Sequence, residues 1–162
     1  MKKVKALGQK AMKRALDSAA RGMKEGEGGP FGACLVKGNR ILAVAHNTVL
    51  KSCDPTRHAE INAIRLACRR LGTFDLQGSE IYSTTEPCPM CFSAIHWARI
   101  KRIYWGTPIG AVHKRGFHEL PISNATMKRF GKSRIQSISG FMKSECETLL
   151  LNWDKLDQKK VY

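Results

Sequence analysis

Long apolar segments are missing from this sequence of 162 residues, which is 43% hydrophobic and 25% charged. No run approaches the roughly 20 apolar residues that a membrane-spanning helix requires, so we expect no membrane partner. Internal repeats, low-complexity segments and candidate linkers are absent as well. A chain of this length can bury a sizeable core, and we therefore expect one domain over residues 1–162.

The N-terminal segment lacks the features of a cleavable signal peptide. The first five residues, MKKVK, are basic like the start of a signal peptide. However, Lys and Arg recur up to residue 24, and no uninterrupted apolar stretch or cleavage site follows. We expect an amphipathic helix over residues 4–23 of a cytoplasmic protein. A mitochondrial-type presequence is the weaker interpretation, because the segment keeps the periodicity of a helix that packs on a core.

Acidic residues are scarce. Only 13 Asp and Glu stand against 28 Lys and Arg, which gives a formal net charge of +15. The basic excess lies mainly in residues 1–24, 99–115 and 128–143. A polyanionic partner such as RNA explains this excess, and a solvated basic surface explains it about equally well.

Short strands and helices alternate along the rest of the chain. Residues 33–47 predict a strand, a Gly-Asn turn and a second strand. Further strands are expected at 79–85, 102–106 and 134–138, and helices at 88–100 and 143–153, whereas 107–130 are expected to be irregular. The last nine residues are expected to extend the helix at 143–153 or to form a loose tail. This order predicts an α/β fold, with helices covering the faces of a sheet.

One further helix is expected from about residue 58 to Gly72, whose glycine suits a helix end. Its expected core-facing side chains are Ile61, Ile64, Leu66, Cys68 and Leu71.

Six cysteines are present, and only Cys88 and Cys91 are closely paired. Cys34, Cys68 and Cys146 lie in apolar runs, where buried and unreactive thiols are expected. A C-x-x-C pair allows a redox pair, a structural metal site or a catalytic metal site. Structural zinc needs four ligands, and the sequence has neither a second C-x-x-C nor an H-x-x-x-H. Catalytic zinc needs one further donor and keeps one position for water.

The stretch DPTRHAEINAI, residues 54–64, can supply that donor. His58 stands just before a predicted helix and Cys88 opens another, so two positive helix ends can meet at one point. Glu60 next to such a site can move protons between water and a substrate. An H-x-E triplet alone is usually ordinary helix surface. Its combination with P-C-x-x-C, 30 residues later, is specific.

That combination resembles the zinc-dependent cytidine and deoxycytidylate deaminase superfamily, over residues 28–106. The resemblance implies a three-layer α-β-α sandwich around a five-stranded mixed sheet. It also implies zinc held by His58, Cys88 and Cys91. Glu60 would then carry protons while an exocyclic amine is removed by hydrolysis.

Two branches of the superfamily share these motifs. The stretches NTVLKSCDPTRHAE, EPCPMCFSAIHWAR, RGFHE and KKVY resemble the guanine deaminases, which act on a free purine base. That resemblance implies Asn47 and Glu119 as contacts to the base. It implies Tyr162 as a residue that closes the pocket, and a homodimer, in which the C-terminal segments can be exchanged between subunits. Phe31 is a further candidate for the pocket wall. We favour this branch, with guanine converted to xanthine and ammonia.

The tRNA adenosine deaminases, which convert wobble adenosine to inosine, are the alternative. DPTRHAE, EPCPMC and GFMKSECETLL resemble them, and the net charge of +15 suits RNA phosphates. A cytosine deaminase is third, but it would leave Asn47 and Glu119 without a purine to bind. A basic RNA-binding module with structural zinc is the non-enzymatic alternative, and it would leave Glu60 without a role. Arg57 stands where both branches usually have Ala, and we expect it to face solvent.

Overall fold

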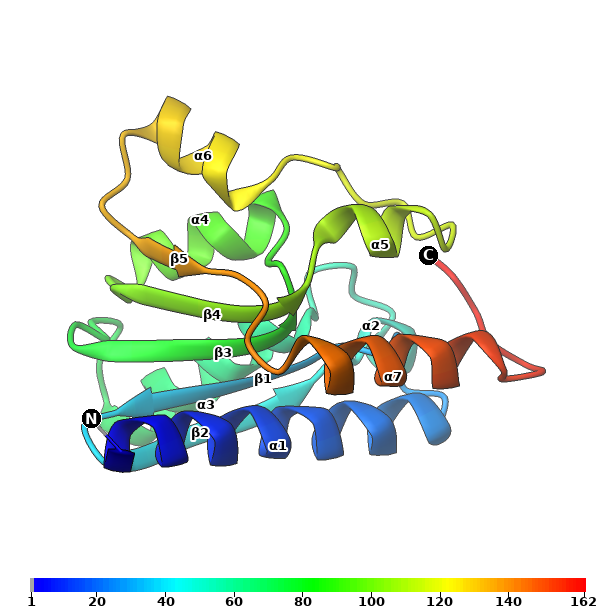
Figure 1. The fold of residues 1–162 in the computed structure, drawn as a ribbon, viewed down its shortest axis with the longest axis horizontal. Coiled ribbons are helices and arrows are strands. Elements are labelled where there is room, and N and C mark those ends of the chain that lie inside the picture. The colour runs from blue at the N-terminus through cyan, green and yellow to red at the C-terminus, as the bar shows by residue number, and fades with distance from the viewer. Residues whose placement is uncertain (1) are drawn as a thin grey trace.

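The computed structural model describes residues 2–162, and it describes side chains from residue 6 onward. The elements are shown in Figure 1. In chain order they are α1 (Lys2–Lys24), β1 (Gly32–Lys37), β2 (Arg40–His46), α2 (Val49–Ser52), α3 (Ala59–Leu71), β3 (Ser79–Thr85), α4 (Pro89–Trp97), β4 (Arg102–Thr107), α5 (Ile109–His113), α6 (Asn124–Gly131), β5 (Gln136–Ile138) and α7 (Lys143–Asp154).

The strands form one five-stranded mixed sheet in the order β2-β1-β3-β4-β5. β1 pairs antiparallel with both β2 and β3, whereas β3 with β4 and β4 with β5 are parallel pairs. β2, β3 and β4 therefore run in the same direction and end at the same edge of the sheet. In open α/β sheets, that edge is where ligands commonly bind.

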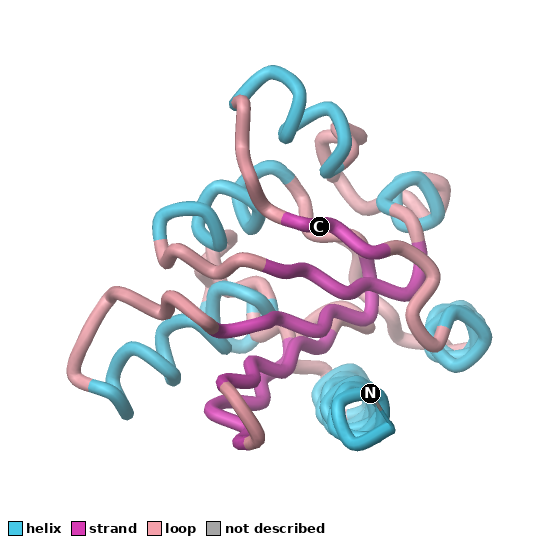
Figure 2. Tube along the Cα trace, turned by 60° about the vertical axis from the view of Figure 1, so that its left-hand side comes forward, coloured by secondary structure: helices cyan, strands magenta, loops and turns pink. Residues whose placement is uncertain are grey.

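Helices cover both faces of the sheet and complete the expected three layers, as Figure 2 shows. α1 and α7 pack on one face and on each other, and α3 lies on the opposite face beside α4. Neighbouring residues of β1 point into the two different cores, as the alternation of a strand requires. Leu35 packs in the cluster that includes α3 and α4, and Cys34 packs with α1 and α7.

Helix α3 lies on the sheet through small side chains. Ala59, Ala63 and Ala67 recur every four residues and are fully buried. The expectation that the larger apolar residues form the buried face is wrong for Leu71, which is 42% exposed. Ile61, Ile64, Leu66 and Cys68 are only half-buried. An alanine face lets the helix approach the strands closely, so the larger side chains are left at its flanks.

The prediction of an irregular segment over residues 107–130 is wrong, because α5 and α6 lie within it. α6 begins after Ser123, whose hydroxyl accepts a hydrogen bond from the backbone N–H of Thr126 at 3.2 Å. This is a standard N-cap, and the sequence S-N-A-T was its available signal. The single turn α2 was also not expected. Helix α1 and strand β5 agree with the predicted ranges to within about two residues.

Three cysteines lie outside the paired motif in or near the cores. Cys34 and Cys146 are buried, and burial raises the pKa of each thiol to about 12, which makes them poor nucleophiles. Cys68 is half-buried, and burial raises its pKa as well. Over residues 2–162, no helix combines the length and the apolar character that a membrane crossing would require.

Candidate metal centre and substrate pocket

Two helix starts meet at the edge where β2, β3 and β4 end. His58 is the residue before α3 and Cys88 is the residue before α4, and both have extended backbones. A side chain at such a position often caps its own helix by a hydrogen bond to a backbone N–H. Neither side chain does so here. Both are therefore free to bind a ligand between the two helices.

The ligand atoms of His58, Cys88 and Cys91 all lie within 4.8 Å of one another. Nδ1 of His58 is 3.7 Å from Sγ of Cys88. Two sulfur atoms and one imidazole nitrogen are a donor set that suits zinc. Three protein ligands leave one position of a tetrahedral ion for water, as in catalytic zinc sites. The residues fit a zinc ion of that kind.

The groups around Cys88 favour a thiolate there. The hydrogen bond with Cys91, helped by His58, lowers the pKa of Cys88 to about 4. Burial works against a charged His58, but contact with Cys88 outweighs it and raises the pKa of His58 to about 9. Burial also raises the pKa of Cys91 well above its usual value. Binding of zinc must therefore displace protons from His58 and Cys91.

Glu60 is the carboxylate beside these three residues. It is 6% exposed, and burial raises its pKa. Its Oε1 accepts a hydrogen bond from the hydroxyl of Ser83 at 2.9 Å, and its Oε2 accepts one from the thiol of Cys91 at 3.5 Å. A buried carboxyl group with a raised pKa is suited to take up and release a proton during a reaction.

A small cavity of about 20 Å³ opens beside these residues. Phe31 and Glu119 line it together with His58, Glu60 and Cys88. Burial, followed by the charge of Cys88, raises the pKa of Glu119 to about 7. The cavity has room for about one water molecule, so neighbouring groups must separate before a larger ligand can enter.

Asn47 brings an unpaired donor to the same edge of the sheet. The side chain is fully buried, and its Oδ1 accepts a hydrogen bond from the backbone N–H of Val49 at 3.1 Å. Its Nδ2 has no hydrogen-bond partner among the described residues. A buried donor without a partner is costly, which makes this amide a candidate ligand contact, although Asn47 is not among the residues that line the cavity.

Tyr162 folds back onto its own chain near the cavity. Its backbone oxygen accepts a hydrogen bond from the N–H of His118 at 2.9 Å, and its hydroxyl accepts one from the N–H of Gly29 at 3.3 Å. Its ring meets Phe117 edge-on with centroids 5.4 Å apart, and Phe117 in turn meets Phe31 at 5.0 Å. The last residues are therefore not a helical extension: residues 157–161 are exposed, and the segment is anchored through Tyr162.

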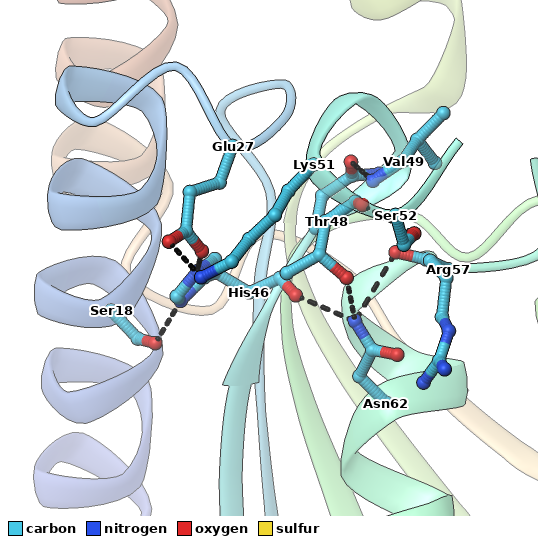
Figure 3. Close-up of polar contacts among 10 residues, drawn as sticks. Ser18, Glu27, His46, Thr48, Val49, Lys51, Ser52, Arg57 and Asn62 are labelled. Carbon is cyan, nitrogen blue, oxygen red and sulfur yellow. Dashed lines mark hydrogen bonds and ion pairs between the residues drawn. The ribbon is translucent and has the colours of Figure 1, made fainter. Parts of the chain in front are cut away.

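The loop before α3 is held by a residue that sequence reasoning missed. Figure 3 shows the amide of Asn62 pointing at three oxygens from two segments. Its Nδ2 donates to the backbone oxygen of His46 at 2.9 Å, to Oγ1 of Thr48 at 3.0 Å and to the backbone oxygen of Arg57 at 3.2 Å. Asn62 thus ties the end of β2 to the residue before His58.

Two other residues of this region point away from the cavity. His46 turns toward α1, where Nδ1 lies 2.9 Å from the hydroxyl of Ser18 and Nε2 lies 2.8 Å from Glu27, as Figure 3 shows. Nε of Arg57 forms an ion pair with Asp54 at 3.3 Å, and the Arg57 side chain is 36% exposed. Arg57 is thus partly solvated, in line with the expectation from its position in the sequence.

Comparison with known proteins gives one family match. Residues 6–107 match the model of the cytidine and deoxycytidylate deaminase zinc-binding region. The guanine deaminase of Bacillus subtilis (strain 168) is 44% identical over 108 residues, which are 67% of this chain and 69% of that protein. The tRNA-specific adenosine deaminase of the same organism is 33% identical over 139 residues, which are 86% of this chain and 83% of that protein.

Among solved structures, the protein NE0047 in complex with 2,6-diaminopurine superposes with a TM-score of 0.81 at 26% sequence identity. The superposition covers 94% of this chain and 83% of that one. The five-stranded sheet and the placement of its helices are therefore shared with a protein that binds a small purine.

Proposed function

This chain belongs to the cytidine and deoxycytidylate deaminase family, and from that membership we propose that it hydrolyses guanine to xanthine and ammonia. The family makes it a deaminase and therefore a hydrolase. The observation that carries the choice of a free base is Tyr162, whose ring packs on Phe117, which in turn contacts Phe31 in the cavity wall, so that Tyr162 would cover a base bound there. A small planar base can be enclosed under this cover, whereas a base that remains part of a tRNA loop needs an open rim for its neighbours.

The residues divide into metal ligands and a proton carrier. His58, Cys88 and Cys91 would hold zinc, which supplies Lewis-acid activation of water when it is bound. Glu60 would take a proton from the attacking water and deliver it to a ring nitrogen. It would then take the proton of the hydroxyl newly bonded to the ring carbon and pass it to the amine, which leaves as ammonia while the carbonyl forms. The hydroxyl of Ser83 holds Oε1 of Glu60, so the other oxygen is the one that faces the reacting groups.

The remaining residues would bind the base. Asn47 offers the free Nδ2 donor to a carbonyl oxygen or ring nitrogen of the purine. Glu119 would accept hydrogen bonds from N–H groups on the opposite edge, and Phe31 would form a wall of the pocket. A purine that presents both kinds of group satisfies both residues.

A tRNA adenosine deaminase is the second candidate. It is supported by the net charge of +15 and by the similarity to the tRNA-specific adenosine deaminase of Bacillus subtilis over 86% of this chain. Neither observation involves the pocket itself. RNA binding through surface cations would depend on salt, whereas binding of a neutral purine should not.

The deciding experiment compares substrates. Zinc-loaded protein is incubated separately with guanine, adenine, cytosine and tRNA that carries a wobble adenosine, and ammonia and inosine are measured. We expect ammonia from guanine and no inosine in tRNA. Inosine formation without guanine turnover would reverse the assignment in favour of a tRNA adenosine deaminase. Turnover of cytosine alone would identify a cytosine deaminase.

Removal of residues 159–162 tests the role of Tyr162. We expect kcat/KM for guanine to fall about tenfold, because one aromatic contact and one hydrogen bond over the pocket together contribute about 1.4 kcal/mol. Steady-state ammonia release measures the change. Lys160→Ala, an exposed substitution within the same segment, is the matched control and should leave kcat/KM unchanged. Unchanged guanine turnover in the truncated protein would remove Tyr162 from the site.

We also propose that the protein is a cytoplasmic homodimer, formed through the flank of α3 and α4. A groove of about 1200 Å³ lies there, and it exposes Trp97 by 80% and Phe74 by 69%. Large exposed aromatic side chains in an apolar groove are typical of protein interfaces. Tyr162 packs within its own chain, so this dimer needs no exchange of C-terminal segments.

The charges around the groove predict how salt affects this dimer. Five Arg and Lys side chains line the groove together with its apolar residues, and none of the lining residues is acidic. A two-fold interface would bring these cations near their copies. Added salt should therefore strengthen the dimer, whereas it would weaken RNA binding at the same place.

Trp97→Ala is expected to weaken the dimer at least about 30-fold, because a central tryptophan in an interface commonly contributes 2 kcal/mol or more. Light scattering coupled to size-exclusion chromatography, over a range of protein concentrations, measures the dissociation constant. Leu151→Ala on α7, which truncates an exposed apolar side chain outside the groove, is the control. A monomeric wild type, or an unchanged dimer in the Trp97 variant, would refute this interface.

A further inference from the structure

Glu86 is a buried carboxylate that the proposed reaction does not use. It is 6% exposed and stands directly before Pro87 and Cys88. Its Oε2 accepts a hydrogen bond from the backbone N–H of Ile109 at 3.2 Å, and its Oε1 accepts one from the backbone N–H of Asn124 at 2.7 Å. Both of its oxygens are therefore engaged by segments that lie far along the chain.

The two donors are the first residues of two helices. Ile109 begins α5 and Asn124 begins α6. Backbone N–H groups at helix starts have no partner within the helix, and a carboxylate there also gains from the helix dipole. Hydrogen bonds to a charged acceptor are stronger than bonds between neutral groups. One side chain thus anchors the beginnings of α5 and α6 together.

The segment between these anchors carries the wall of the pocket. Glu119 and Phe117 lie between α5 and α6, and Glu119 lines the cavity with His58 and Cys88. Further bonds join the same partners. Nδ2 of Asn124 donates to the backbone oxygen of Pro87 at 2.6 Å, and the N–H of Glu86 donates to the backbone oxygen of Thr107 at 2.8 Å.

We propose that Glu86 is a positioning residue that fixes Glu119 relative to the metal ligands. It joins the loop that presents Cys88 to both ends of the segment that presents Glu119, so the two parts of the site keep one geometry. The proposal rests on the proposed function in one respect, since it takes Glu119 as the residue that binds the base.

The test replaces Glu86 by Gln, which preserves the size of the side chain. Gln retains one acceptor oxygen, but its NH₂ group then faces one of the two backbone N–H donors. We expect amide hydrogen exchange in residues 109–124 to become at least about tenfold faster, with little change in β3, and zinc content to stay at one per chain. KM for guanine should rise about tenfold, with a smaller change in kcat.

A double-mutant cycle with Glu119→Gln separates positioning from general stability. If Glu86 acts through Glu119, the two substitutions together should raise KM little more than Glu119→Gln alone. Glu80→Gln is the matched control. Glu80 is a half-buried glutamate on β3 that pairs with Arg102 at 2.7 Å. Its loss should leave KM and exchange in residues 109–124 unchanged.

The outcomes distinguish this proposal from the proposed function. Unchanged exchange in residues 109–124, or additive effects on KM, would overturn the positioning role. If the wild type turns over no purine, the guanine assignment fails, but hydrogen exchange still decides whether Glu86 joins the two segments. If Glu86→Gln does not fold, Asn124→Ala serves instead. It keeps the backbone N–H that Glu86 binds, removes the side-chain bonds with Pro87 and Ser137, and should show the same changes to a smaller extent.

Discussion

Replacement of Glu60 by Gln is expected to abolish ammonia release while zinc content stays the same. The loss should be about 10²–10⁴-fold, the range that a positioned proton carrier usually contributes. Gln fits the same space and can still accept the hydrogen bond from Ser83, but it cannot take up or deliver a proton. Ammonia release in single-turnover and steady-state assays measures the effect, and elemental analysis measures the zinc.

The control is Glu145→Gln, an exposed glutamate in the first turn of α7 that should leave both measurements unchanged. Turnover at the wild-type rate in the Glu60 variant would rule out the proposed proton transfer. A variant that lost its zinc would show that Glu60 acts on the metal site rather than on the proton. The thermal midpoint should stay the same or rise, because burial of a charged group is no longer required.

Removal of zinc by a chelator is expected to eliminate all deaminase activity and to lower the thermal midpoint by roughly 5–10 °C. A ligand present at 100 times its dissociation constant stabilises the folded state by about 2.7 kcal/mol, and each kcal/mol corresponds to about 2–4 °C in a chain of this size. The three ligands connect the start of α3 to the first turn of α4, so the ion stabilises the packing between them.

Differential scanning fluorimetry and ammonia release, each before and after zinc is added back, measure this prediction. Cys91→Ser should lose zinc and show the same low midpoint with or without the metal. Cys53→Ser removes an exposed thiol outside the site and should bind one zinc per chain. Activity that survives complete chelation would contradict a catalytic metal.

The metal group could be predicted because its signals are local. His58 and Cys88 each precede a helix, and the sequence marks both starts. Ser83, Glu86 and Asn62 could not be found in this way. Each forms a hydrogen bond with a partner more than ten residues away in the sequence. Their residue types are also common in strands and helices, so they give no local signal. Only the assembled sheet brings such partners together.

The buried face of α3 shows another limit. Hydrophobic periodicity is judged mainly from the positions of large apolar side chains, and it therefore predicts that Ile61 and Leu71 face the core. The helix instead approaches the sheet along Ala59, Ala63 and Ala67, because close packing favours small residues where backbones come near each other. α6 was missed for a different reason. It spans only Asn124–Gly131, which is too short for its periodicity to stand out, and its clearest signal is the cap at Ser123.

The closed cavity of about 20 Å³ has a consequence for binding. Under the proposed function, only molecules in which the groups that line this cavity have moved apart can accept a purine, and these form a fraction of the population. The apparent dissociation constant equals the intrinsic one divided by that fraction, so an open state of one in a hundred weakens apparent affinity about 100-fold. The contacts that hold the lining of this cavity closed would therefore set how much substrate the protein needs before it responds.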